Sequence, residues 1–324
     1  MKQRKISKTN VVNFSTYLGM VIFFVVMTIL SSTGVLTRSM TGLLVPICCY
    51  MSMAVSLNLT VGILGELSLG HAGFMSVGAF SGIIAAMSLQ SAVPNDLVRM
   101  IVALVVGAFF AAIVGFIVGI PVLRLRGDYL AIVTLGFGFI IKILAINNPQ
   151  ITNGAIGLND IPQQPHLLFW CGLFALLATG MILQLVWSKY GRMMKAIRDD
   201  EDAAIAMGVN TFRIKTCAFA TSAFFEGIGG GLLAMYQCMA QANNFKTNMT
   251  YEILLIVVIG GIGSISGSVI ASFLFTACNE WWLRFLDSTQ AFSSPTAPTR
   301  IFFIVLFAVA VAGGAQRRIR PRGR

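Results

Sequence analysis

Apolar stretches about as long as a membrane is thick recur along the whole chain of 324 residues. A helix that crosses a bilayer needs roughly 20 mostly apolar residues. The candidate spans are residues 12–30, 41–62, 67–89, 97–120, 129–146, 166–187, 214–238, 251–263, 265–284 and 300–315. The sequence therefore predicts an all-α, polytopic transmembrane helical bundle of about 8–10 spans, which forms a single domain over residues 1–324.

Charged residues are too scarce to cover a soluble surface. Asp, Glu, Lys and Arg make up 11% of the chain, whereas the apolar set AVILMFWYC makes up 56%. A typical soluble domain carries roughly 25% charged residues. These proportions exclude an ordinary soluble domain and leave a protein whose solvent is mostly lipid.

The net charge of +11 is explained by topology. When the N-terminus is placed inside and the spans alternate, 17 of the 23 basic residues fall on the inner side. Lys and Arg gather on cytoplasmic loops of membrane proteins, so we expect both termini in the cytoplasm and no nucleic-acid partner. The same topology makes 147–165 an extracytoplasmic loop and 188–213 a cytoplasmic loop. The first apolar run, from Val11 to Leu30, exceeds the roughly 7–15 residues of a signal peptide core, which favours an uncleaved span.

Enzyme motifs are missing from the sequence. The dipeptide Gly-Lys of a Walker A motif does not occur, nor do HExxH, GxSxG or CxxC, and His71 and His166 are the only histidines. An enzyme within the membrane would need a nucleophile–base pair or a metal site. We therefore expect no catalytic residue, no metal and no cofactor on this chain.

Two glycine-rich stretches are expected to break helices. One runs from Gly62 to Gly82 and the other from Gly260 to Gly267. Closely spaced glycines let helix backbones approach or let a helix unwind. Unwound segments near the midplane are a common device for substrate sites in transporters. We hypothesise that the two broken segments face each other as corresponding parts of two halves.

The longest hydrophilic stretch on the inner side is residues 191–208, GRMMKAIRDDEDAAIAMG. Its apolar spacing predicts a short helix bounded by Gly191 and Gly208. Ala203, Ala204, Ala206 and Met207 add a patch of small and apolar residues, which suggests a partner surface. A simple solvated loop is the alternative.

Four motifs resemble the branched-chain amino acid (LIV) permease family of bacterial ABC importers. The first is the 191–208 stretch, which is similar to G-R-A-x-x-A-I-R-D-x-E-x-A-A-x-x-x-G. The second is NLTVGILGELSLGHAGFMSVGAF at 58–80, and the third is GDYLAIVTLG at 127–136, followed by TNGAIG, which resembles the M-type subunit. The fourth is GGIGSISGS at 260–268, with Ser268 where the family usually has proline.

The resemblance implies a permease subunit in the bacterial inner (plasma) membrane that transports branched-chain amino acids. It implies as partners a related H-type permease, two ATPase subunits that hold ATP and magnesium, and an extracytoplasmic substrate-binding protein. It also makes the 191–208 segment the coupling loop that contacts an ATPase. The coupling residues that it implies are Gly191, Arg192, Ala196, Arg198, Glu201, Ala203, Ala204 and Gly208.

Ionisable groups in or near spans are functional candidates because charge is costly in lipid. Glu226 lies in the middle of a span, where a carboxylate must be protonated, paired or exposed to a polar path, and Lys142 is a possible partner. His71 could instead sit in a turn and bond a carbonyl. With the glycine breaks, these groups define a candidate substrate path: Glu66, Ser68, Gly70, His71, Thr134, Glu226, Gly260, Gly261 and Gly263.

Two other functions remain open. Urea and short amides are alternative substrates, because urea permeases share the motifs of this family. A chain of a different class, an ion-coupled secondary transporter acting alone, would use Glu66, Glu226 and Lys142 for ion coupling.

Overall fold

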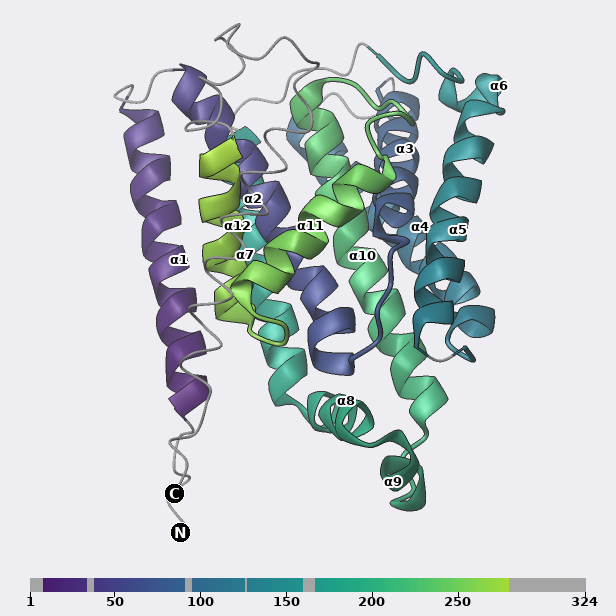
Figure 1. The fold of residues 1–324 in the computed structure, drawn as a ribbon. Coiled ribbons are helices and arrows are strands. Elements are labelled where there is room, and N and C mark those ends of the chain that lie inside the picture. Colours follow the sequence, from purple (N-terminus) through teal and green to yellow (C-terminus); the bar gives the residue numbers. More distant parts are fainter. Residues whose placement is uncertain (1–7, 34–37, 91–94, 126, 160–166, 280–324) are drawn as a thin grey trace, which may run out of the picture.

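The structure, a computed structural model, describes residues 8–33, 38–90, 95–125, 127–159 and 167–279. Within these ranges the chain is helical, and its β-structure is one isolated antiparallel bridge between Leu158 and Ala240. The elements are α1 (Lys8–Ser32), α2 (Arg38–Asn58), η1 (Leu59–Leu64), α3 (His71–Ser88), α4 (Asp96–Val122), α5 (Asp128–Ile146), α6 (Pro149–Thr152), α7 (Leu167–Trp187), α8 (Lys189–Asp199), α9 (Glu201–Ala206), α10 (Thr211–Gln237), α11 (Thr247–Gly260) and α12 (Ile265–Ala277). The all-α helical bundle predicted from the sequence is confirmed (Figure 1).

Six helices in the described part of the chain are long and apolar enough to cross a membrane. They are α2 continued by η1, α3, α4, α5, α7 and α10. Three further apolar helices are shorter, at Ser15–Ser31, Thr247–Gly260 and Ile265–Ala277. At 1.5 Å per residue, α11 with its 14 residues is about 21 Å long, so it is shorter than the hydrocarbon core of roughly 30 Å. The predicted span at 300–315 lies outside the described residues.

Helices α3, α4 and α10 form the most closely packed part of the bundle. Gly78 of α3 faces the backbone of Gly227 in α10, and Gly107 of α4 faces the carbonyl of Gly78. A Cβ atom added to Gly78 would overlap the Gly227 backbone. Glycine at these crossings therefore lets three helices touch through their backbones, the arrangement in which small residues favour helix association in lipid.

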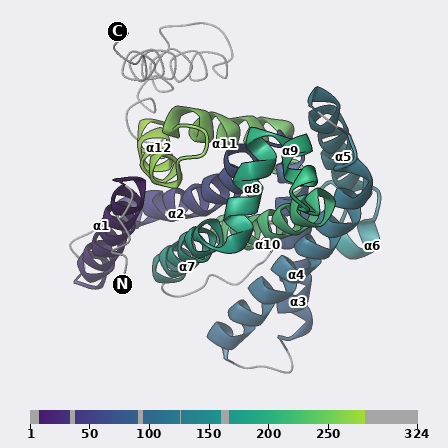
Figure 2. The ribbon, with the colours of Figure 1, turned by 90° about the horizontal axis from the view of Figure 1, so that it is seen from below.

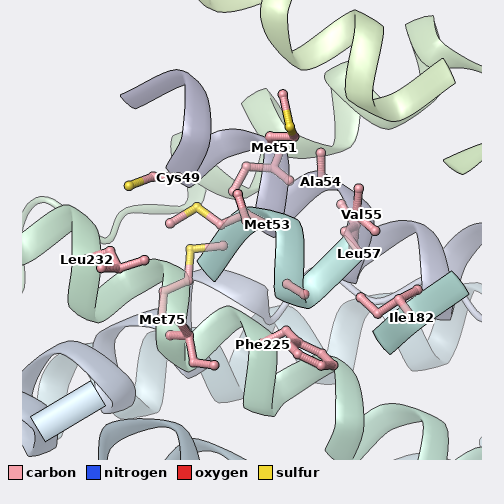
Figure 3. Packing of buried hydrophobic residues seen from close by; sticks show 14 of the residues in the cluster. Cys49, Met51, Met53, Ala54, Val55, Leu57, Met75, Ile182, Phe225 and Leu232 are labelled. Carbon is pink, nitrogen blue, oxygen red and sulfur yellow. The ribbon is translucent and has the colours of Figure 1, made fainter. Parts of the chain in front are cut away.

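Helix α2 joins this group to the rest of the bundle, because it packs against α7, α10, α11 and α12. Met53 of α2, Met75 of α3, and Phe225 and Leu232 of α10 belong to one buried apolar cluster (Figure 3). Flexible methionine side chains fill the irregular spaces between these crossing helices.

Both glycine-rich stretches break their helices, as predicted. Helix α2 continues as the π-helical turn η1 and ends at Gly65, whose φ of 87° lies in the left-handed region that favours glycine. Residues 66–70 are not helical, and α3 begins at His71. The second break follows α11 at Gly261, with φ of 93°, and α12 begins at Ile265. The predicted spans 67–89 and 251–263 are therefore each part helix and part unwound chain.

The hydrophilic 188–213 stretch forms a cap at one end of the bundle (Figure 1). Helix α8 contacts α7, η1, α9 and α10, and Figure 2 shows it lying across the bundle when the molecule is seen from that end. The broken end of α2 thus lies directly against the cap.

The Gly78 crossing can be tested against a helical glycine in open space. Gly136 of α5 has no neighbour within 4 Å of an added Cβ among the described residues. Both Gly→Ala changes gain about 0.5–1 kcal/mol from backbone entropy, but Gly78→Ala also forces overpacking, which costs about 1–3 kcal/mol. We expect a lower thermal midpoint for detergent-solubilised Gly78→Ala and an unchanged or higher midpoint for Gly136→Ala. Equal midpoints for the two variants would contradict the close backbone contact.

Candidate functional site

The predicted helix at 191–208 is in fact two short helices, α8 and α9, with a sharp corner between them. The Ser188 hydroxyl caps α8 by accepting from the Tyr190 N–H, and the Asp200 carboxylate caps α9 by accepting from the Ala203 N–H at 3.0 Å. Asp200 itself is extended, with φ of −160°, which ends α8. The predicted start at Gly191 is wrong, because α8 begins at Lys189 and Gly191 is buried against the Val186 backbone.

The α8–α9 segment (residues 189–206) ends two residues before Gly208, the predicted end, where the backbone turns with φ of 83°. Met194, Ile197 and Ala204 are buried in the bundle. The opposite face is exposed and includes Arg192, Ala196 and Ala203. Ala204 was expected on a partner surface, but it is 4% exposed and anchors α9 instead.

Arg198 connects the α8–α9 segment to the broken end of α2. Its Nη1 donates to the Gly62 carbonyl in η1 at 3.1 Å, and its aliphatic stem packs where Gly65 has no side chain. Its other nitrogens bond the carboxylate of Asp199. The Gly62 carbonyl lies in the last turn before the helix ends at Gly65, and a guanidinium from the cap supplies a hydrogen-bond donor there.

A buried lysine makes a second connection between the same parts. Lys215 Nζ, in the first turns of α10, lies 2.5 Å from Glu66 Oε1 and 2.8 Å from Glu201 Oε1. The side chain of Lys215 is 4% exposed. One cation therefore holds a carboxylate of the broken segment 66–70 and a carboxylate of α9 together.

The two breaks lie against each other, as hypothesised. The Asn58 side chain donates to Ser268 Oγ at 2.9 Å and accepts from the Gly263 N–H at 2.8 Å. Gly62 and Gly263 are so close that a Cβ on Gly62 would overlap the Gly263 backbone. Gly260 packs in the same way against Gly267. These contacts join the end of α2 to the turn between α11 and α12.

Farther into the bundle, His71 and Glu226 form a buried pair. The imidazole Nδ1 contacts the carboxylate Oε1, and the two side chains are 1% and 0% exposed. Ser222 donates to Glu226 Oε1 at 2.9 Å, and Ser56 of α2 donates to the Ser222 carbonyl at 2.7 Å. The pair therefore lies in a polar network that joins α2, α3 and α10.

The unwound chain before His71 is held by hydroxyl groups. The Leu69 N–H donates to Thr134 Oγ1 at 3.0 Å, and the Ala72 N–H donates to Thr250 Oγ1 at 3.2 Å. Gly70 packs against the backbone of Thr134. Among the described residues, the buried polar atoms here without a hydrogen-bond partner include Ser68 Oγ, His71 Nε2 and Glu226 Oε2.

Comparison with known proteins identifies the family. Residues 39–312 match the family described as "Branched-chain amino acid transport system / permease component". The chain belongs to this permease family. The chain is 32% identical over 268 residues to the protein named "High-affinity branched-chain amino acid transport system permease protein LivM" in Escherichia coli, a match that covers 71% of this chain and 60% of that protein. The protein of the same name in Salmonella typhimurium gives the same identity and coverage.

A more distant relative is the "Probable branched-chain amino acid transport permease protein LivM" of Methanocaldococcus jannaschii. It is 25% identical over 254 residues, which cover 67% of this chain and 74% of that protein. The chain thus spans about 60% of the length of the first two relatives. No solved structure matches the chain. A permease component is a transport subunit and not a catalytic enzyme.

Within this permease, the predicted path residues form two groups. Ser68, Gly70, His71, Thr134 and Glu226 gather around the start of α3. Glu66 and the glycines Gly260, Gly261 and Gly263 lie instead at the other end of the broken segments, near the cap.

Two sequence-based interpretations of single residues are wrong. The partner of Glu226 is His71, whereas Lys142 was considered from the sequence. His71 contacts that carboxylate, whereas a bond to a backbone carbonyl was the alternative. The sequence reasoning also missed Asn58, Lys215, Ser222 and Thr250, although Asn58 and Lys215 are polar residues in or beside apolar runs and were visible for that reason.

The His71–Glu226 pair can be tested by a double-mutant cycle. Removing one partner leaves a buried charge or dipole uncompensated, which costs about 3–5 kcal/mol. We expect Glu226→Leu alone to lower the free energy of unfolding by that amount and His71→Leu/Glu226→Leu to recover much of it. The measurement is unfolding in mixed micelles.

Lys142→Leu with Glu226→Leu provides the matched cycle. Because the two residues are not in contact, their effects should add to within about 0.5 kcal/mol. A larger coupling of Glu226 to Lys142 than to His71 would refute the pairing.

Proposed function

We propose that this chain is the M-type permease subunit of an ABC importer that carries branched-chain amino acids across the inner membrane of a bacterium. Separate ATPase subunits hold ATP and magnesium and power the transport. A related H-type permease completes the channel, and an extracytoplasmic binding protein delivers the substrate. Both termini and the α8–α9 segment face the cytoplasm in this proposal. The printed names of the relatives and the family description support the transport of branched-chain amino acids.

The observation that carries the proposal is the direct bonding between the α8–α9 segment and a broken transmembrane helix. Arg198 holds the Gly62 carbonyl, and Lys215 joins Glu201 to Glu66. A force on α8 and α9 is therefore transmitted to η1 and residues 66–70 through bonds rather than through a flexible loop. This arrangement suits a subunit whose transport step is driven by a motor outside the membrane.

The exposed face of the α8–α9 segment suits an ATPase partner. Ile205 is 49% exposed, and Met207, directly after α9, is 84% exposed. Ala196 and Ala203 lie exposed on the same segment. Apolar side chains gathered in the most hydrophilic part of the chain suggest a surface that a partner covers.

In the mechanism that follows, ATP-driven closure of the ATPases moves α8 and α9 relative to the bundle. Arg198 and Lys215 pass this movement to the end of α2 and to Glu66. Residues 66–70 lead directly into His71, so the unwound chain shifts the start of α3. The affinity for substrate must differ between the outward and inward states, because otherwise ATP would shift no equilibrium.

Two variants separate docking from transmission. Arg198→Ala removes a charge-assisted hydrogen bond worth about 1.5–3 kcal/mol. A free energy of this size corresponds to roughly a 10- to 150-fold change in an equilibrium constant. We expect Arg198→Ala to retain the ATPases in pull-down experiments but to lose at least about tenfold of ATP-driven leucine uptake in proteoliposomes. Ala203→Arg should instead lose the ATPases, because it places a bulky charge on the exposed face.

Each variant is the control for the other. Normal uptake by Arg198→Ala would refute transmission through Gly62. Retention of the ATPases by Ala203→Arg would refute the assigned docking face.

The energy source separates this proposal from the ion-coupled transporter. Glu66 forms an ion pair with the buried Lys215, and Glu226 contacts the buried imidazole of His71, as expected for structural pairs. We expect leucine uptake by the reconstituted complex to require ATP on the side of the membrane where the ATPases lie. We also expect uptake to persist when an ionophore collapses the proton gradient. Uptake that follows the proton gradient without ATP would overturn the proposed function.

A further inference from the structure

A pocket of about 180 Å³ lies between the start of α3, the second half of α5 and the start of α11. Pockets for drug-sized ligands occupy roughly 300–1,000 Å³, so this one has room only for a small solute. Its lining residues are Leu69, Ala72, Leu135, Gly138, Phe139, Lys142, Phe245, Lys246, Thr247, Asn248 and Thr250. The end of α5, next to α6, lies at the opposite end of the bundle from α8 and α9 (Figure 1).

Two lysines and no carboxylate line this pocket. Lys142 is half-buried and Lys246 is exposed, and neither forms an ion pair with a described residue. A half-buried ammonium group without a counter-charge attracts an anion, because low polarity around it strengthens the attraction. Lys246 also precedes α11, whose first turn has no side-chain cap, so its N–H groups add to the positive end of the pocket.

The rest of the lining suits an apolar solute with polar ends. Leu69, Leu135 and Phe139 form apolar walls. Asn248 and Thr247 bring amide and hydroxyl oxygens, which accept hydrogen bonds from an ammonium group. The chemistry of the pocket therefore matches a molecule with one carboxylate, one ammonium group and an aliphatic side chain.

We infer that this pocket binds the transported amino acid, with Lys142 and Lys246 holding its carboxylate. The inference rests on the proposed function and deepens it, because it names the chemical group that is recognised. Urea and short amides carry no carboxylate, so the lysine pair favours amino acids over these alternative substrates. It also gives Lys142 a role that neither the Glu226 pair nor the α8–α9 contacts require.

The pocket shares its wall with the unwound chain before α3. Leu69 and Ala72 line the pocket, and their N–H groups are held by Thr134 and Thr250. Any shift of residues 66–70 that the cap transmits therefore changes the shape of the pocket. This link supplies the difference in affinity between two states that directed transport requires.

The test is equilibrium binding of radiolabelled leucine to the purified permease complex in lipid nanodiscs, without the binding protein. Unlabelled leucine should displace the radiolabelled leucine. Leucinamide, which lacks the carboxylate, and urea should displace it at least about tenfold less well. Lys142→Gln and Lys246→Gln should each raise the Kd for leucine by at least about tenfold, the loss expected for a hydrogen bond to a charged group. Lys142→Arg and Lys246→Arg keep the charge and should bind within about threefold of wild type.

Four outcomes would overturn the inference. They are no measurable binding of leucine by the wild-type complex, equal competition by leucinamide, wild-type affinity in both glutamine variants, or a loss of affinity that vanishes in nanodiscs free of anionic lipid. The last would show that the lysines hold a lipid phosphate. Monodisperse elution and retained ATPases exclude misfolded variants.

Different experimental results would refute the inference about the pocket and the proposed function. ATP-driven uptake by the wild type, together with unchanged leucine affinity in the glutamine variants, refutes only the pocket. Absence of ATP-driven uptake by the wild type refutes the proposed function itself.

Discussion

The need to give every backbone N–H and C=O group a hydrogen-bond partner inside lipid governs this structure. An unpaired N–H or C=O costs several kcal/mol in the hydrocarbon region, so a helix can unwind there only where protein groups replace its lost bonds. In the part of the chain that the structure describes, the glycine-rich stretches unwind after Leu64 and after Gly260. At both breaks a side chain from elsewhere supplies the bond. Arg198 donates to the Gly62 carbonyl, and Asn58 accepts from the Gly263 N–H.

These replacement bonds also determine how the parts are connected. The guanidinium that serves Gly62 comes from α8, and the hydroxyls that serve Leu69 and Ala72 come from α5 and α11. A continuous helix would satisfy itself and would need none of these partners. Breaking the helix therefore binds the cap, α5 and α11 to one short segment. The same requirement that makes the break costly makes it a point where several helices are connected.

The sequence was sufficient to predict the features that depend on local composition. The apolar runs predicted the helices, and the glycine clusters predicted both breaks and their mutual contact. Gly65 and Gly261 adopt positive φ, which glycine favours, so these positions are encoded locally. The corner between α8 and α9 was also encoded locally, because Asp200 is a strong N-cap, but the stretch 191–208 was interpreted as one short helix.

Pairings between distant residues could not be predicted in this way. His71 and Glu226 are 155 positions apart, and the sequence offered Lys142 as a possible partner for Glu226, whereas the packing of α3 against α10 brings His71 to it. Ala203 and Ala204 illustrate the same limit at short range. The two alanines are chemically identical, and only the orientation of α9 on the bundle makes one exposed and the other buried. Tertiary contact, not composition, decides such roles.

The buried ion pairs determine which elements of the structure are held together. A buried ion pair is weak evidence for stability, because desolvation offsets most of the Coulomb attraction. Lys215 with Glu66 and Glu201, and His71 with Glu226, add at most a little to the free energy of unfolding when intact. They are costly to break, however, so they fix which elements move together. Lys215 ties the cap to residue 66, and five residues later His71 ties the start of α3 to α10. The unwound chain between these two anchors carries Leu69 into the wall of the lysine-lined pocket. Residues 66–70 are therefore the part of the chain that connects the cap to the wall of the pocket.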